Sequence, residues 1–176
     1  MLFLLGPLLL LLYRLFVTGV EDPIKYIYTV TGSSALALLY ATTSLSLLRR
    51  AVNLIRYRRM VGLFSFFYAA LHLLNFALLD MELDLSSAVA ETLEKPFIYL
   101  GMSAFAILLF MAVTSQRALF AKFYPYHKAV YAAIVLATAH FVMAQKVLSV
   151  VQWWCLALML LVVVLKIAQR IGSIRF

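Results

Sequence analysis

The feature that most restricts the fold of this chain is a series of apolar stretches, each bounded by charged residues. Each stretch is about as long as a helix that crosses a bilayer, which needs about 17–25 residues. Of the 176 residues, 66% are hydrophobic and only 12% are charged. A soluble protein of this size leaves too much surface in water to bury so many apolar side chains. We therefore predict an all-α integral membrane protein, because a segment in lipid must satisfy its backbone hydrogen bonds internally.

Six such stretches predict a bundle of six transmembrane helices that forms a single domain over residues 1–176. Their approximate ranges are 2–18, 31–48, 60–79, 97–114, 128–145 and 149–166. A cleaved signal peptide is the alternative for the first stretch, but a basic n-region and an A-x-A cleavage site are both missing. The connections are short apart from 79–96. No Walker, Rossmann or metalloprotease motif occurs, and we find no internal repeat.

Charge is distributed unevenly between the two ends of the predicted bundle. One end carries eleven basic residues and no acid: Arg49, Arg50, Arg56, Arg58, Arg59, Arg117, Lys122, Lys128, Lys166, Arg170 and Arg175. The other end carries all seven acidic residues. Because cytoplasmic loops are enriched in Lys and Arg, we place both termini and the basic loops in the cytoplasm. This topology explains the net charge of +8 without a nucleic-acid partner.

The three histidines lie in or at the ends of predicted spans, where ionisable residues are rare and mark candidate sites. His72 follows Arg59, at the cytoplasmic start of the third span, by 13 residues, and His140 follows His127, at the start of the fifth, by 13. At the helical rise, both imidazoles lie about 20 Å from the cytoplasmic edge. Two imidazoles at one depth on neighbouring parallel helices suit the two axial positions of a haem iron. We therefore predict a haem held between helices three and five.

Other interpretations stay open at this point. A membrane histidine also serves as a helix–helix hydrogen bond, worth about 1 kcal/mol, and zinc would lack further ligands here. His127, at the cytoplasmic boundary, is a candidate ligand of a second haem, a partner for quinone or flavin, or part of an aromatic belt. Arg58 and Arg59 lie at the matching depth of the third span and are candidate cofactor-binding residues. Arg14, near the outer edge, suits a haem propionate or snorkels to water.

Several short motifs, taken in order over residues 21–146, resemble one known family. They are Glu21-Asp22-Pro23-Ile24-Lys25, Thr31-Gly32, Arg58-Arg59-Met60-Val61-Gly62-Leu63, Tyr68-Ala69-Ala70-Leu71-His72, Lys95-Pro96-Phe97, Gly101, Thr114-Ser115, and His127 through Val130-Tyr131 to His140. The chain resembles the MsrQ (YedZ) family, the haem-binding membrane subunits of periplasmic methionine sulfoxide reductase systems. That family belongs to the ferric-reductase-like transmembrane group.

The resemblance implies one or two b-type haems with His72, His127 and His140 as ligands, and an association with FMN. It also implies a bacterial inner-membrane protein that takes electrons from the quinone pool or a cytosolic flavin reductase. The electrons would pass to a periplasmic molybdopterin subunit of the MsrP type, which repairs oxidised envelope proteins. The chain would then be an electron-transfer subunit without its own substrate-converting site. The alternatives are a stand-alone ferric-reductase-like cytochrome b and a non-redox membrane scaffold or small transporter.

Overall fold

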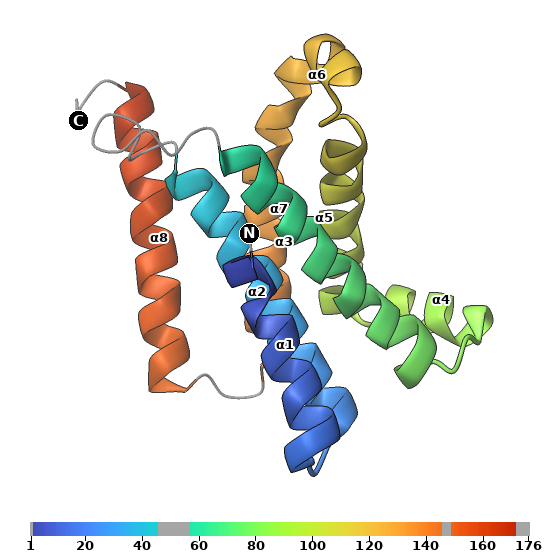
Figure 1. Cartoon of the computed structure of the whole chain (residues 1–176). Helices are drawn as coiled ribbons and strands as arrows, with labels where there is room; N and C mark the ends of the chain where they lie inside the picture. Colours follow the sequence, from blue (N-terminus) through green and yellow to red (C-terminus); the bar gives the residue numbers. More distant parts are fainter. Residues whose placement is uncertain (1, 46–56, 146–148, 172–176) are drawn as a thin grey trace.

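The computed structural model describes residues 2–45, 57–145 and 149–171, and all its regular elements in these ranges are helical (Figure 1). The α-helices are α1 (Gly6–Tyr13), α2 (Pro23–Ser44), α3 (Arg58–Leu74), α4 (Leu85–Glu94), α5 (Pro96–Val113), α6 (Arg117–Phe123), α7 (Val130–Ala144) and α8 (Val150–Ile171). Short 3₁₀- or π-helical stretches adjoin them: η1 (Leu2–Leu5), η2 (Arg14–Thr18), η5 (Asn75–Asp80) and η6 (Tyr124–Ala129). The all-α prediction is confirmed for the described part of the chain.

Each predicted span overlaps a described helix, although residues 46–48 of the second span lie outside the described residues. The helices differ in how well they suit a membrane crossing. Among the described residues, three segments are long and apolar enough to cross a membrane, Arg58–Asp80, Pro96–Val113 and Arg117–Ala144. Shorter apolar helices cover Phe3–Thr18 and Gln152–Leu165. Helix α2 has 22 residues, but its Thr and Ser residues lower its hydropathy. The count of six spans therefore stays a prediction.

Two helices lie where the sequence analysis expected only connections. Helix α4 occupies most of the 79–96 stretch, and α6 with η6 leads into α7. They lie at opposite ends of the molecule (Figure 1). The sequence initiates α4 locally, because the Asp84 carboxylate accepts hydrogen bonds from the main-chain N–H groups of Ser86 and Ser87, as an N-cap residue does. The sequence analysis assigned no secondary structure to this longer connection, and the structure shows that it contains a capped helix.

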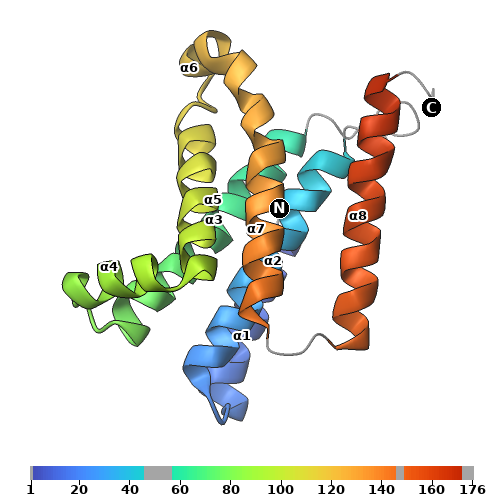
Figure 2. The ribbon, with the colours of Figure 1, turned by 180° about the vertical axis from the view of Figure 1, so that it is seen from behind.

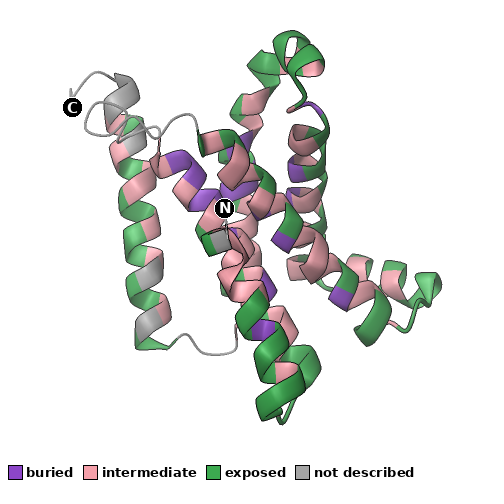
Figure 3. Ribbon diagram, viewed as in Figure 1, coloured by how far each residue is buried: buried purple, intermediate pink, exposed green. Residues whose placement is uncertain are grey.

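The centre of the molecule consists of two pairs of packed helices, α2 with α3 and α5 with α7 (Figure 2). Within the first pair, the Ser65 hydroxyl donates to the carbonyl of Ala35 at 2.8 Å. The pairs are joined by an apolar cluster from α2, α5 and α7: Leu36, Leu39, Tyr40, Leu108, Val130, Ala133 and Ile134. Tyr40 and Thr138 add a hydrogen bond of 2.7 Å between their hydroxyls. Buried residues accordingly gather where these four helices meet (Figure 3).

A buried tyrosine of α3 forms hydrogen bonds with the N-terminal helical stretch, which also packs on α2. Tyr68 on α3 is fully buried, and its hydroxyl donates to the carbonyl of Leu4 at 2.8 Å. The same hydroxyl accepts from the main-chain N–H of Leu8 at 3.2 Å. Helix α8 lies alongside α2 and exposes most of its apolar side chains, as a lipid-facing helix does (Figure 3).

Part of the charge pattern used for the topology falls outside the described residues. These positions are Arg49, Arg50 and Arg56 of the predicted basic loop, Lys146 of an outer connection, and Arg175 near the end of the sequence. The described basic residues Arg117 and Lys122 lie on α6. The acidic residues Glu91 and Glu94 lie on α4, at the opposite end (Figure 1). The described charges are thus separated along the bundle, and the orientation in the membrane stays a prediction.

Candidate functional site

His72 lies near the end of α3, with its imidazole against α2. Its Nδ1 is 3.3 Å from the Thr31 hydroxyl oxygen. The Thr31 hydroxyl already donates its proton to the carbonyl of Ile27 at 2.6 Å. The oxygen must therefore accept from His72, which places the imidazole proton on Nδ1. The Nε2 lone pair of His72 is left available to a ligand.

His140 on α7 has the same tautomer as His72, fixed by a different hydrogen-bond partner. Its Nδ1 lies 2.6 Å from the main-chain carbonyl oxygen of Phe97, at the start of α5. A carbonyl only accepts, so Nδ1 carries the proton and the Nε2 lone pair is again available. The ring of Phe97 also stacks on the imidazole, with 5.9 Å between the ring centroids.

The structure brings these two imidazoles together. Their ring centroids are 6.0 Å apart and their planes are nearly perpendicular, at 88°. His72 belongs to the α2–α3 pair and His140 to the α5–α7 pair, so the rings meet where the pairs face each other. Both side chains are half-buried. The juxtaposition agrees with the equal depth expected from the sequence, while the role of the imidazoles as ligands stays a prediction.

His127 lies apart from this imidazole pair and has the opposite tautomer. It belongs to η6, and its Nε2 is 3.0 Å from the Thr114 hydroxyl oxygen. The Thr114 hydroxyl donates to the carbonyl of Phe110 at 2.7 Å, so it accepts from His127 Nε2–H. The ring also packs edge-on against Phe120, with centroids 4.8 Å apart. The nitrogen that is free in the other two histidines is thus occupied in His127.

The structure does not bring the candidate arginines to the imidazole pair. Arg58 and Arg59 form the first turn of α3, about 13 residues before His72 and therefore some 20 Å away along the helix. Arg58 is close enough to His127 for a Coulomb interaction. Arg14 begins η2, and its side chain is exposed. Arg58 thus belongs with His127 at the basic end of the bundle, and no described contact links these arginines to the imidazole pair.

The sequence analysis did not assign a role to the partners of the imidazoles. Thr31 and Phe97 appeared only as parts of family motifs, although they fix the tautomers of His72 and His140. A threonine within a helix has a usual intrahelical role, since its hydroxyl can bond to the carbonyl four residues earlier. The signal was therefore too common to indicate a site, and a main-chain acceptor such as Phe97 leaves no side-chain signal at all.

The donor set at the pair fits haem better than it fits a free metal ion. In the described part of the chain, no three His, Cys, Asp or Glu side chains are grouped as they would be to hold a metal ion. Zinc sites normally take three or four such ligands. Two neutral imidazoles with available Nε2 atoms match the two axial positions of a haem iron. The residues present therefore fit the cofactor that the sequence led us to expect.

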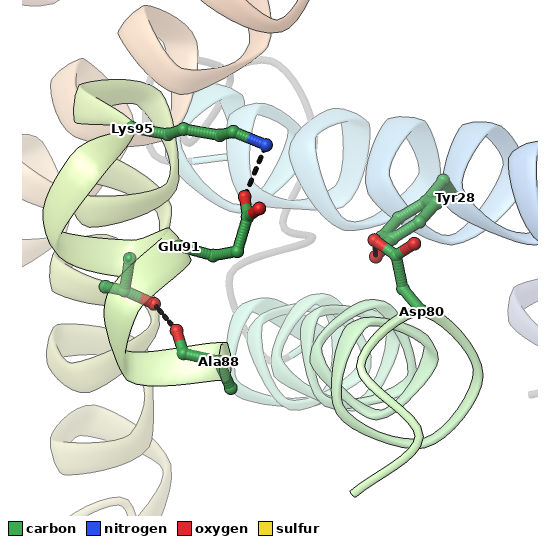
Figure 4. Close-up of polar contacts among 6 residues, drawn as sticks. Tyr28, Asp80, Ala88, Glu91 and Lys95 are labelled. Carbon is green, nitrogen blue, oxygen red and sulfur yellow. Dashed lines mark hydrogen bonds and ion pairs between the residues drawn. The ribbon is translucent and has the colours of Figure 1, made fainter. Parts of the chain in front are cut away.

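Polar contacts beyond the imidazole pair lie near the acidic end of the bundle (Figure 4). The Tyr28 hydroxyl donates to the Asp80 carboxylate at 2.9 Å and thereby joins α2 to the end of η5. Lys95 forms an ion pair with Glu91 at the end of α4. Tyr28 also packs edge-on against His72, with 5.1 Å between the ring centroids. An aromatic ring therefore lies between His72 and the surface carboxylate Asp80.

Comparison with known proteins places this arrangement in a family. The sequence profile described as ferric reductase like transmembrane component matches residues 29–138, which include His72 and His127 and end two residues before His140. The chain belongs to the ferric-reductase-like transmembrane family. With its long apolar helices, this ferric-reductase-like chain is therefore a multi-pass membrane protein.

Named relatives narrow the resemblance. The chain is 36% identical over 131 residues to protein-methionine-sulfoxide reductase heme-binding subunits MsrQ of Brucella ovis, Brucella canis and Brucella suis. Each alignment covers 71% of this chain and 60% of the relative. The chain thus spans about 60% of the length of the curated relatives that it matches. No solved structure gives a significant match to the chain.

Proposed function

We propose that this ferric-reductase-like chain holds a b-type haem between His72 and His140 and serves as a membrane electron-transfer subunit. In this proposal it delivers electrons to a periplasmic molybdopterin-containing methionine sulfoxide reductase, which repairs oxidised envelope proteins. The relatives named above are heme-binding subunits of a protein-methionine-sulfoxide reductase, which supports the haem and a methionine sulfoxide reductase as partner. We place the chain in a bacterial inner membrane, with its basic end in the cytoplasm.

The observation that carries the proposal is the imidazole pair. Two histidines from separate helix pairs approach to 6.0 Å between ring centroids, and each Nδ1–H is held by an acceptor on the neighbouring helix. Hydrogen bonds of this kind fix the tautomer and ring orientation of metal-ligating histidines and raise their basicity. Two histidines that served only as packing residues would not need both Nε2 atoms available.

The residues of the site suit electron transfer without substrate chemistry. A haem with two imidazole ligands supplies one-electron chemistry at its iron and leaves no iron position for a substrate. Thr31 and the Phe97 carbonyl hold the two imidazole protons. We therefore propose that the chain has no substrate-converting site of its own, and we assign no described residue to FMN.

We place the electron donor at the basic end and the acceptor at the acidic end. Arg58 on α3 and His127 on η6 both lie at the basic end, where a quinone or a reduced flavin has cationic and hydrogen-bonding groups to bind. At the other end, Tyr28 and Asp80 connect His72 to the surface. The acceptor subunit would dock there, beside the acidic residues of α4 and the segment before it.

Single alanine substitutions of the three histidines test the proposal, and His127 is the matched control. His72→Ala and His140→Ala should each abolish the low-spin haem spectrum, because each removes one axial ligand. His127→Ala should keep one low-spin haem, because its Nε2 is bonded to Thr114. The measurement is the optical spectrum of purified protein, oxidised and dithionite-reduced, with haem quantified per chain.

The same spectra separate the alternatives. A full low-spin haem in His72→Ala would remove this histidine from the proposed site. A colourless wild-type protein, expressed with adequate haem, would leave a non-redox scaffold with packing histidines. Co-purification of a molybdenum protein with the haem-loaded chain distinguishes a reductase subunit from a stand-alone ferric-reductase-like cytochrome.

A further inference from the structure

Each of the two central imidazoles lies directly against a glycine of the neighbouring helix. A Cβ atom added to Gly32 on α2 would lie 2.8 Å from Cε1 and 3.0 Å from Nδ1 of His72. A Cβ atom added to Gly101 on α5 would lie 2.8 Å from Nδ1 and 2.9 Å from Cε1 of His140. Separations below 3.0 Å are too short for carbon contacts, since favourable contacts begin near 3.5 Å. The space that these glycines leave empty is therefore filled by the imidazoles.

The two contacts have the same local construction. An aromatic residue stands four positions before each glycine, Tyr28 before Gly32 and Phe97 before Gly101. Each aromatic ring contacts the same imidazole as its glycine does, at 5.1 Å for Tyr28 and 5.9 Å for Phe97 between centroids. The acceptor for Nδ1–H lies on the same turn, as Thr31 beside Gly32 and as the Phe97 carbonyl.

We infer that Gly32 and Gly101 are positioning residues, each forming a seat that fixes one axial imidazole against the backbone of the adjacent helix. This inference deepens the proposed function and rests on it. Each seat consists of a glycine that contacts the imidazole, an aromatic side chain that packs against the imidazole, and a hydrogen-bond acceptor for Nδ1–H. The glycine sets the distance between the imidazole and the helix, and the acceptor sets the rotation of the ring.

Helix stability alone does not explain a glycine at either position. Glycine within a helix is less favourable than alanine, and both glycines have ordinary helical φ rather than the positive φ that needs glycine. A methyl group at either site would push the imidazole away from its helix. The ring could not move without stretching its hydrogen bond to Thr31 or Phe97. The seat therefore determines both the position and the tautomer of each ligand.

Alanine substitutions at four glycines test the inference. Gly32→Ala and Gly101→Ala should weaken haem binding by about 10-fold or more, the size of effect seen for groups that orient metal ligands. The haem that remains should be partly high-spin, and added imidazole should return it to the low-spin form. Gly62→Ala and Gly6→Ala are the controls. At Gly62 the new methyl would meet Thr42 at an ordinary 3.6 Å, and at Gly6 nothing lies within 4 Å.

A double-substitution cycle keeps the test decisive where a single variant fails to accumulate. In a His72→Ala background the clash is gone, so Gly32→Ala should leave thermal stability and detergent elution of the haem-free protein unchanged or improved. The same holds for Gly101→Ala with His140→Ala. A double variant that stays unstable, or single variants with wild-type haem affinity and spin state, would overturn the inference. Full haem in His72→Ala would instead contradict the proposed function, and the cycle would still report whether the glycine seats the imidazole.

Discussion

At the scale of single residues, the three histidines differ in which ring nitrogen donates a hydrogen bond to the protein. His72 contacts the hydroxyl of Thr31, and His127 contacts the hydroxyl of Thr114. Each threonine hydroxyl donates its own proton to a main-chain carbonyl four residues earlier. The hydroxyl faces Nδ1 of His72 but Nε2 of His127, so the two imidazoles expose opposite nitrogens. The same residue type therefore offers a ligand atom at one position and a hydrogen-bond donor at the other.

Removal of the Thr31 hydroxyl should loosen the His72 ligand. Thr31→Val keeps a branched side chain of similar size but removes the acceptor for Nδ1–H, and such changes weaken metal sites by about 10–100-fold. Titration of haem-free protein with haem, followed at the Soret band, measures the loss. Thr29→Val is the control, because the exposed Thr29 hydroxyl bonds only to the carbonyl of Lys25 on the same helix. Equal haem affinity in the two variants would contradict the assigned role of Thr31.

The sequence predicted the imidazole pair but not its surroundings. Counting residues from the charged helix starts placed His72 and His140 at one depth, because helical rise converts sequence spacing directly into distance. The seats at Gly32 and Gly101 lie about 40 residues from the histidines that they contact. Finding them requires knowing which helices pair and which faces meet. An aromatic residue four positions before a glycine is too common a pattern to indicate a haem site by itself.

At the scale of elements, hydropathy predicted the long helices and missed α4. Long, uninterrupted apolar stretches predict the membrane helices, because a helix that crosses lipid needs apolar side chains along its length. Helix α4 is short, and its exposed apolar residues Leu85, Val89 and Leu93 recur every four positions between polar ones. That spacing, directly after Asp84 as N-cap, indicates an amphipathic surface helix. A search limited to spans long enough for a bilayer cannot detect it.

The N-cap of α4 gives a prediction about pH. Hydrogen bonds from Ser87 and Ser86 lower the pKa of Asp84 to about 2 from an ordinary 3.8. Because the folded pKa is the lower one, the cap's contribution is complete above about pH 4 and is lost as pH falls toward 2. The carboxyl ¹³C shift of Asp84 in labelled protein should titrate near 2. Ser87→Ala should move that midpoint toward 3.8, since the Ser87 hydroxyl makes the largest contribution.

Controls for this titration lie on the same helix. Ser86→Ala should raise the Asp84 pKa less than Ser87→Ala does, because the Ser86 hydroxyl contributes less. Thr92→Val, whose hydroxyl bonds to the carbonyl of Ala88, should leave it unchanged. If Asp84 titrated near 3.8 in the wild-type protein, and Ser87→Ala did not change that midpoint, Asp84 would not be the cap of α4.

At the scale of the whole molecule, the proposed haem site lies where two helix pairs face each other. Along α2 and α7, the apolar cluster that joins the pairs lies on the basic side of the imidazoles. Leu36 follows Gly32 on α2 by one turn, and Ile134 precedes His140 on α7 by six residues. The two helix pairs are thus packed together on the basic side of the imidazoles. The proposed site lies nearer the acidic end. An electron held there is closer to the surface carrying α4 than to the basic end.

This arrangement transfers electrons outward only if the acidic end faces the periplasm, as the charge distribution predicts. Two exposed positions at opposite ends test the orientation, Ala90 on α4 and Gln116 before α6. In a Cys155→Ser background, Ala90→Cys should react with a membrane-impermeant maleimide in intact spheroplasts. Gln116→Cys should react only after the membrane is permeabilised. The reverse result would place the acceptor end in the cytoplasm and exclude a periplasmic reductase as partner. If both cysteine variants reacted in intact spheroplasts, positions 90 and 116 would lie on the same side of the membrane. The chain between them would then not cross the membrane once, as the prediction requires.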